Sequence, residues 1–343
     1  MIMKMIRQGL AAVCAALFVG TTIPAILFFN LEAQAFTPEL YQRVFAGENF
    51  YERLPGIISE TLTNQPANGL PIPMPGLDAQ GWETFLRAVL PPATLKSMGD
   101  QTLVSIFAYL DDQSDSASIP LAPLKASLQG EAGVQAVVRL LQTQPACTLQ
   151  QIAEITFAIM TGGQFTLCNP PEQMLGALTP AIQAQLQAVS TTLPDQITIA
   201  SSSNPQDDPR ARLKTARLLM RLSPALPLGF LLLMTIFAVR SLRDWLNWWG
   251  ASFLTSGLIA GSMGLSGAPL VGLVLTSFLE KQIPAYLPPI LLDNTNQIIS
   301  AIVDALLQPV FRQGLALTIL GAGMALISFY SAKNQSKTKP APR

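Results

Sequence analysis

The first apolar stretch of the chain, residues 8–31, reads QGLAAVCAALFVGTTIPAILFFNL and has 24 residues without a charge. Three further uncharged stretches follow near the C-terminus: 18 residues at 222–239, 35 at 245–279 and 20 at 313–332. A helix of about 20 apolar residues crosses the hydrocarbon core of a bilayer, so each stretch is long enough for one crossing. The sequence therefore predicts a mainly α-helical membrane protein with four transmembrane helices.

The spacing of these stretches predicts the organisation of the chain. Residues 32–222 separate the first stretch from the second, and this region is far longer than an ordinary connection between helices. We expect, in order, a cytoplasmic N-terminus (1–8), a transmembrane helix (9–31), an inserted helical domain (32–208), a basic juxtamembrane stalk (209–222), a three-helix membrane bundle (223–332) with an interfacial helix near 295–310, and a cytoplasmic tail (333–343).

Charge is distributed unevenly along the chain. Lysine and arginine together number 21, as do aspartate and glutamate, so the net charge is zero. Residues 32–208 carry 17 acidic and 6 basic side chains, a net charge of −11, whereas residues 209–222 carry five basic side chains and no acidic one. An acidic domain repels a phosphate backbone, so we expect no nucleic-acid partner for it.

Composition excludes several classes of catalytic and metal site. The chain has no histidine, which excludes Ser-His-Asp and Cys-His catalysis and histidine-ligated zinc. Its three cysteines are too few for a four-cysteine zinc or iron–sulfur site. We therefore predict no catalytic residue, no metal site and no cofactor.

Basic residues near the ends of the stretches indicate the orientation. Lys4 and Arg7 precede the first stretch, and the first basic residue on its far side is Arg43. Because positively charged flanks stay in the cytoplasm, we place both termini on the cytoplasmic side of the cell membrane and residues 32–222 outside. The basic stalk argues for the opposite orientation, with the domain in the cytoplasm, and this alternative stays open.

The first stretch has a second interpretation, as a cleaved signal peptide. Ala33-Gln34-Ala35 matches the small-residue pattern of a cleavage site. However, the apolar run is longer than the about 7–15 residues that are typical of a signal peptide. We therefore favour an uncleaved transmembrane anchor.

The inserted domain is predicted to be mainly helical, with a small β-ribbon. Apolar residues recur at helical spacing in the segments 38–47, 51–64, 82–90, 103–110, 128–141, 149–160 and 174–189. A proline-rich connection occupies 65–76, and two segments, 118–121 and 196–199, have the pattern of strands. Cys147 and Cys168 flank one predicted helix, and outside the cytoplasm we expect them to form a disulfide.

Two groups of side chains are predicted to lie at the membrane surface. Four cations of the stalk recur at i, i+4, i+7 and i+11 and therefore share one helix face: Arg210, Lys214, Arg217 and Arg221. We expect this face to bind anionic head groups; the alternatives are pairing with the acidic domain and simple solvation. Beyond the second stretch, an interfacial aromatic anchor is predicted at Trp245, Trp248 and Trp249.

The third uncharged stretch contains small residues at four-residue spacing. They form a GxxxG pair followed by a second stripe: Gly257, Gly261, Gly264, Ala268 and Gly272. Small residues allow two helices to approach closely. We expect this surface to pack within the membrane bundle, and the alternative is a contact between two copies of the chain in a homo-oligomer.

Four short segments carry a resemblance to a known group. They are FTPELY at 36–41, YERLP at 51–55, CNPPE at 168–172 and RSLR at 240–243. On these segments the chain resembles an uncharacterised group of bacterial membrane proteins with one N-terminal span, an extracytoplasmic helical domain and a C-terminal three-helix membrane bundle. The resemblance extends over nearly the whole chain and implies this layout, without implying an activity.

These features favour a non-enzymatic integral membrane protein. Its acidic domain would bind a partner, either an envelope protein or a ligand, while the spans anchor it in the lipid bilayer. The alternatives are a transporter or channel component and a membrane-bound hydrolase that uses carboxylates. The uncharged stretches contain no aspartate, glutamate, lysine, arginine or histidine, which argues against transport, and no pair of acidic residues stands out as catalytic.

Overall fold

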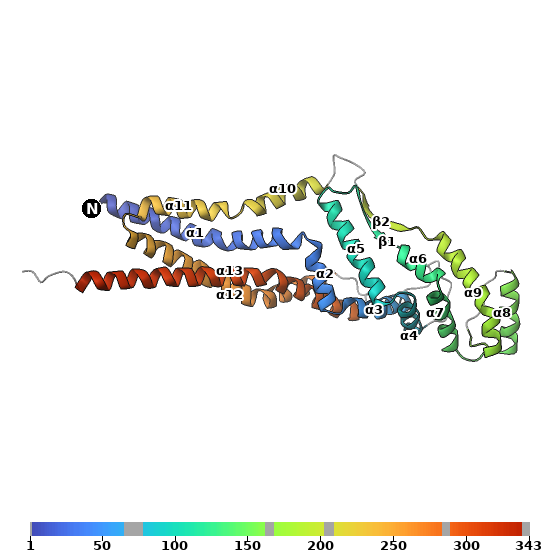
Figure 1. The fold of residues 1–343 in the computed structure, drawn as a ribbon. Coiled ribbons are helices and arrows are strands. Elements are labelled where there is room, and N and C mark those ends of the chain that lie inside the picture. Colours follow the sequence, from blue (N-terminus) through green and yellow to red (C-terminus); the bar gives the residue numbers. More distant parts are fainter. Residues whose placement is uncertain (1, 65–77, 162–167, 202–208, 283–288, 338–343) are drawn as a thin grey trace, which may run out of the picture. The chain divides into compact units, whose positions relative to one another are not determined.

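The computed structural model of the chain describes residues 2–64, 78–161, 168–201, 209–282 and 289–337 (Figure 1). These residues are mostly helical and include one two-stranded antiparallel sheet, which confirms the predicted fold class in its coarse form. They form two compact units. The bundle unit comprises Met1–Leu40, Asp207–Gln282 and Asn296–Arg343, and the inserted unit comprises Tyr41–Gln206 and Ile283–Thr295.

The bundle unit is built from apolar helices together with the short basic helix of the stalk. They are α1 (Ile2–Ala35), α10 (Pro209–Leu222), α11 (Ala225–Ala238), α12 (Leu242–Gln282) and α13 (Pro289–Lys337). Three segments are long and apolar enough to cross a membrane: Met5–Ala35, Arg210–Ala238 and Thr295–Ser331. The second of these includes the basic stalk, because α10 and α11 are separated only by the turn at Ser223 and Pro224.

The prediction of four spans is therefore corrected to three candidate spans among the described residues. The third uncharged stretch lies in α12, a continuous helix of 41 residues that is not among these three segments. Glycine and serine are frequent in the first half of α12 and lower the mean hydropathy of that half. Residues 295–310, predicted as a separate interfacial helix, belong to α13, which continues without a break into the last apolar stretch.

The inserted unit consists of shorter helices and the β-ribbon. The helices are α2 (Pro38–Gly47), α3 (Phe50–Asn64), α4 (Ala79–Val89), α5 (Pro92–Leu110), α6 (Ala122–Gln129), α7 (Glu131–Gln142), α8 (Leu149–Thr161) and α9 (Glu172–Thr192). Local chemistry sets several helix starts: Asp78 Oδ1 accepts a hydrogen bond from the Gly81 amide (2.8 Å) at the start of α4, and Pro92 is the first residue of α5. The predicted proline-rich connection at 65–76 lies outside the described residues.

The single helix predicted at 128–141 is wrong, because the structure divides this segment into α6 and α7. Gly130 adopts an extended conformation (φ −84°, ψ 179°), ends α6 and precedes the first residue of α7. Gly133 lies so close to the end of α6 that an added Cβ would be 2.6 Å from the carbonyl oxygen of Leu128. A side chain at Gly133 would therefore prevent the close packing of the two helices.

The β-ribbon is confirmed, although the first strand begins two residues and ends one residue earlier than predicted, and the second extends two residues further. Strands β1 (Ser116–Pro120) and β2 (Gln196–Ser201) pair antiparallel, with Ile119 opposite Ile197 and an irregularity between Ala117 and Ser118. An ion pair between Lys125 Nζ and Asp195 Oδ1 (2.6 Å) fixes the end of the ribbon beside α6. The ribbon thus joins segments that are far apart in the sequence.

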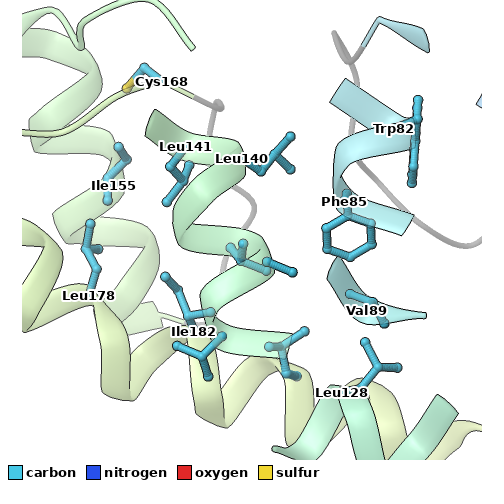
Figure 2. Packing of buried hydrophobic residues seen from close by; sticks show 14 residues of the cluster. Trp82, Phe85, Val89, Leu128, Leu140, Leu141, Ile155, Cys168, Leu178 and Ile182 are labelled. Atoms are coloured by element: carbon cyan, nitrogen blue, oxygen red, sulfur yellow. The ribbon is translucent and has the colours of Figure 1, made fainter. Parts of the chain in front are cut away.

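The core of the inserted unit lies between α4, α6, α7, α8 and α9 (Figure 2). Phe85 and Val89 of α4 and Leu140 of α7 are each less than a tenth exposed and belong to one buried cluster. Leu178 and Ile182 of α9 contribute to the same cluster from consecutive turns. Burial of these side chains stabilises the unit, because each fully buried large apolar side chain contributes about 1.5–3 kcal/mol.

Candidate functional site

Helix α1 runs antiparallel to α11 and α10 over most of its length. Near its start, the Arg7 guanidinium donates a hydrogen bond to the carbonyl oxygen of Phe237 (2.8 Å) at the end of α11. Further along, Ser223 Oγ donates to the carbonyl oxygen of Ala25 (3.0 Å). Between these contacts lies a buried apolar cluster of Cys14, Phe18, Leu231 and Met234. The first span is therefore an integral part of the bundle unit.

The basic stalk contacts the end of α1 through Arg217. The Arg217 guanidinium lies 3.7 Å from Glu32 Oε1 and 4.9 Å from the centroid of the Phe36 ring. Arg210 is only 7% exposed, whereas Lys214 and Arg221 are exposed. The four predicted cations thus lie in different environments, and binding of head groups by this face stays a prediction.

The tryptophans at the start of α12 pack against other helices of the bundle unit. Trp248 and Trp249 lie against the buried cluster of α1 and α11, and Trp249 Nε1 donates a hydrogen bond to Thr235 Oγ1 (3.0 Å). Trp245 stacks at a tilt on Trp249, with ring centroids 5.0 Å apart. These contacts give the three side chains a packing role, and their place relative to a bilayer stays a prediction.

Glycines bring α12 and α13 into close antiparallel contact. A Cβ added at Gly257 would lie 2.5 Å from the Thr318 amide nitrogen, and one at Gly264 would lie 2.7 Å from Phe311 Cα. From the other side, a Cβ at Gly314 would lie 2.5 Å from the Gly261 amide nitrogen. Helices that approach so closely leave no room for side chains at these positions.

The predicted small-residue stripe is only partly accounted for by this contact. The backbone of Gly261 lies against Gly314, but a Cβ at Gly261 itself would meet nothing within 4 Å, so a side chain there would point away from α13. Ala268 and Gly272 belong to α12, but their surroundings lie outside the described residues. Contact between two copies of the chain is untested.

A pair of amide side chains joins α1 to α13 inside the bundle unit. Asn30 Nδ2 donates to Gln313 Oε1 (2.9 Å), and Gln313 Nε2 donates back to Asn30 Oδ1 (3.2 Å). Asn30 is only 4% exposed. A second polar contact joins α12 to α13, where Ser328 Oγ donates to Asn247 Oδ1 (2.6 Å).

Sequence reasoning missed both the amide pair and the glycines of α13. Asn30 and Gln313 lie near the ends of uncharged stretches, where a polar amide side chain is easily noticed among apolar residues. Nothing in the sequence indicates that these two amides contact each other. Gly314 and Gly321 are seven residues apart, which places them on one face of a helix. A search for glycines at seven-residue spacing, in addition to GxxxG, would have found this face.

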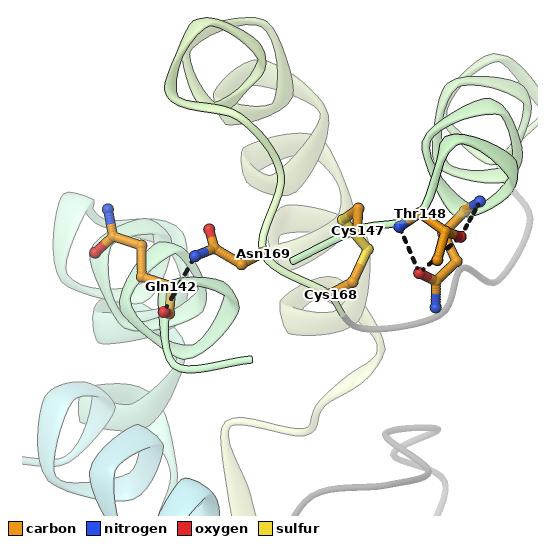
Figure 3. Close-up of a disulfide and its surroundings, with 6 residues drawn as sticks. Gln142, Cys147, Thr148, Cys168 and Asn169 are labelled. Atoms are coloured by element: carbon orange, nitrogen blue, oxygen red, sulfur yellow. Dashed lines mark hydrogen bonds between the residues drawn. A yellow bond between two sulfur atoms is a disulfide. The ribbon is translucent and has the colours of Figure 1, made fainter. Parts of the chain in front are cut away.

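The predicted disulfide between Cys147 and Cys168 is present, with the two Cα atoms 4.9 Å apart (Figure 3). The two backbone segments also form hydrogen bonds with each other. The Cys147 amide donates to the Asn169 carbonyl oxygen (3.0 Å), and the Asn169 amide donates to the Pro145 carbonyl oxygen (2.8 Å). Cys168 is 2% exposed and belongs to the buried core. The disulfide therefore fixes the segment before α9 to the segment before α8.

A polar cluster lies between α3 and α5 in the inserted unit. Tyr51 Oη donates to Asp100 Oδ1 (3.5 Å), whose other carboxylate oxygen pairs with Lys96 Nζ (2.6 Å). Burial raises the pKa of Tyr51 to about 12, and the negative charge of Asp100 and its hydrogen bond add to this effect. A Cβ at Gly99 would lie 2.6 Å from Tyr51 Oη, so glycine is needed beneath the ring.

One open depression is found on the described surface of the inserted unit. An open depression of about 330 Å³ lies between α4 and α7 and is lined by Ala88, Glu131, Ala132, Gln135 and Arg139. It contains one carboxylate, beside one guanidinium. The described residues contain no group of three or more cysteine, aspartate or glutamate side chains arranged to hold a metal ion.

Comparisons with models of protein families, with curated proteins and with solved structures find no match to this chain. The resemblance to a bacterial membrane protein group therefore stays a prediction. The coarse layout on which it depends is present in the structure, with candidate spans at the N-terminus, in the middle and at the C-terminus of a mostly helical chain.

Proposed function

We propose that this chain is a non-enzymatic integral membrane protein. Its disulfide-bonded inserted unit lies on the extracytoplasmic side, where it binds an envelope protein or a ligand, and its apolar helices anchor it in the bilayer. Both termini lie in the cytoplasm. The observation that carries this proposal is the disulfide between Cys147 and Cys168, in a chain that has three candidate spans.

The disulfide supports an oxidising compartment for the inserted unit. Disulfides persist outside the cytoplasm and are rare inside it, where thiols are kept reduced. The two cysteines are 21 residues apart, and a closed loop of this length stabilises a fold by about 3 kcal/mol on the chain-entropy model. A unit whose stability depends on this bond is suited to the extracytoplasmic side.

Packing of α12 on α13 supports a fourth crossing that composition alone does not indicate. Gly250 lies against Met324, Gly257 against Thr318 and Gly264 against Phe311, so the two helices keep one antiparallel register. The same register places Asp244, at the start of α12, level with the end of the last uncharged stretch of α13. If α13 crosses the bilayer, the first half of α12 crosses beside it, and the C-terminus returns to the cytoplasm.

The proposal is tested by the accessibility of thiols in intact cells. A membrane-impermeant maleimide is applied to cells that produce the Cys14→Ser variant, with and without prior reduction. We expect labelling of Cys147 and Cys168 only after reduction. The matched control is the Cys14→Ser/Cys168→Ser variant, in which the half-buried Cys147 is expected to react without reduction if the unit lies outside.

The opposite orientation gives a different pattern of labelling. Labelling only after the cells are opened, without any need for reduction, would place the inserted unit in the cytoplasm and overturn the proposed location. Binding is tested separately, by chemical crosslinking on whole cells followed by purification of the full chain. The proposed role is supported if the crosslinked species depends on the inserted unit, and contradicted if removal of residues 41–206 leaves the same species.

A further inference from the structure

The last turn of the stalk helix α10 carries a cation whose environment differs from that of its neighbours. Arg217 pairs with Glu32 of α1 and lies over the Phe36 ring. Arg221, one turn further along the same face, is exposed, and the described part of the chain provides no ion pair for it. Its charge must therefore be compensated by solvent or by a bound anion.

Two contacts of α10 with α1 fix the level of Arg221. Arg217 lies beside Glu32, and Ser223 donates to the carbonyl oxygen of Ala25. Arg221 lies between these contacts, about 6 Å beyond Arg217 along the helix axis, at a rise of about 1.5 Å per residue. It is therefore level with the last turns of the uncharged stretch 8–31, inside the boundary that Glu32 marks.

Apolar side chains at the same level of the two helices are exposed. Leu218 and Leu222 of α10 are 57% and 56% exposed, and Phe28 of α1 is 47% exposed. Leucines in such positions face lipid when the segment Arg210–Ala238 crosses a bilayer. An arginine among them extends its guanidinium toward the head groups, where a phosphate accepts two parallel hydrogen bonds from it.

We propose that Arg221 binds the phosphate of an anionic phospholipid at the membrane boundary. The inference rests on the proposed membrane crossing by Arg210–Ala238, and it holds for either side of the membrane. Arg221 also lies in the last turn of α10, where a cation interacts favourably with the helix dipole. The dipole interaction is the same in every lipid, so lipid dependence distinguishes the two roles.

The test compares Arg221→Gln with a matched variant, Arg212→Gln. Both arginines are exposed and belong to α10, but Arg212 is nine residues further from the uncharged stretch, about 14 Å along the axis. The full-length protein is purified in detergent and supplied with phosphatidylglycerol and phosphatidylcholine in equal amounts. The ratio of the two lipids that remain bound is measured by native mass spectrometry.

The wild-type protein is expected to retain phosphatidylglycerol in preference. Arg221→Gln is expected to reduce that preference about fivefold, the size of one basic residue at an anionic surface, and Arg212→Gln is expected to leave it unchanged. Arg221→Lys keeps the charge without the two parallel hydrogen bonds and is expected to give an intermediate ratio. This variant also provides the test if Arg221→Gln does not fold.

Three results would overturn the inference. Equal retention by the wild type and Arg221→Gln would exclude a role for this side chain, and equal loss in Arg212→Gln would indicate diffuse attraction by the whole stalk. A rise in melting temperature with inorganic phosphate equal to that with phosphatidylglycerol would indicate a site for free anions. Extraction of the protein from membranes by alkaline carbonate would contradict the membrane crossing itself, and would thus be distinguishable from a failure of the lipid site.

Discussion

At the scale of single residues, the amide pair Asn30–Gln313 is the clearest polar contact between the two ends of the chain. Each side chain donates one hydrogen bond to the other, and Asn30 Nδ2 also donates to the carbonyl oxygen of Ile26 (2.7 Å). Removing one partner leaves a buried amide unsatisfied, which costs more than the loss of the hydrogen bond itself. The pair therefore selects one arrangement of α1 against α13.

We expect Asn30→Leu and Gln313→Leu each to lower the free energy of unfolding by about 1–2 kcal/mol. The double variant is expected to cost less than the sum of the two, because no unpaired amide then remains. The measurement is unfolding of the purified full-length protein in mixed micelles with increasing denaturing detergent. Strictly additive losses in the double-mutant cycle would show that the two side chains do not interact.

Tyr51 contributes to the pH dependence of the stability of the inserted unit in alkaline solution. Its pKa is raised from 10.0 to about 12 in the folded protein, so the unfolded chain loses this proton first. The stabilising contribution is therefore complete below about pH 10 and is lost as the pH rises from 10 to about 12.

This prediction is checked by tyrosinate absorbance. The difference between the wild-type protein and Tyr51→Phe is expected to contain one group that titrates near pH 12. Asp100→Asn removes the negative charge beside the phenol and is expected to lower that pKa, while the part due to burial remains. Superimposable titrations of wild type and Tyr51→Phe would contradict the assignment.

At the scale of elements, apolar periodicity predicts most helices of the inserted unit to within a few residues. The segment 51–64 became α3 (Phe50–Asn64), and 149–160 became α8 (Leu149–Thr161). The break at Gly130 was missed because apolar residues on both sides of it enter the same core, so their spacing does not reveal that the backbone is extended there. In α12, length and composition lead to different expectations, because glycine and serine lower the mean hydropathy of its first half.

The contact between α12 and α13 predicts different effects for substitutions at the two glycines of one GxxxG pair. Gly257→Ala places a methyl group 2.5 Å from the Thr318 amide nitrogen, whereas a methyl group at Gly261 meets nothing within 4 Å. Overpacking of this kind costs about 1–3 kcal/mol. We therefore expect Gly257→Ala to lower the melting temperature of the purified protein and Gly261→Ala to leave it equal or higher. Equal losses in the two variants would contradict the register.

At the scale of the bundle unit, polar and charged groups are placed where the antiparallel register provides partners for them. Arg7 donates to the carbonyl oxygen of Phe237 near the end of α11, Glu32 pairs with Arg217 of α10, and Asn247 accepts from Ser328. These partners belong to segments from both ends of the sequence, so no local pattern predicts them. Apolar periodicity and the placement of charges identify the helices in the sequence. Which of their polar side chains form contacts between helices depends on how the helix faces pair, and this pairing is visible only in the structure.

The position of α1 argues directly against removal of the first span as a signal peptide. Cleavage after Ala35 would remove Arg7, Phe18, Asn30 and Glu32 together, and with them contacts to α10, α11 and α13. Loss of the Phe18 contacts alone would expose Leu231 and Met234, which are 4% and 0% exposed in the structure. We therefore expect the mature protein to retain α1.

Intact mass of the protein purified from membranes checks this expectation, with the Ala33→Leu/Ala35→Leu variant as the matched control. That variant lacks the small residues which a signal peptidase requires. The wild type and the variant are expected to differ only by the mass of the two substitutions, because neither is processed. A wild-type chain that begins at Phe36, beside a full-length variant, would show that α1 is cleaved and that α10 to α13 hold together without it.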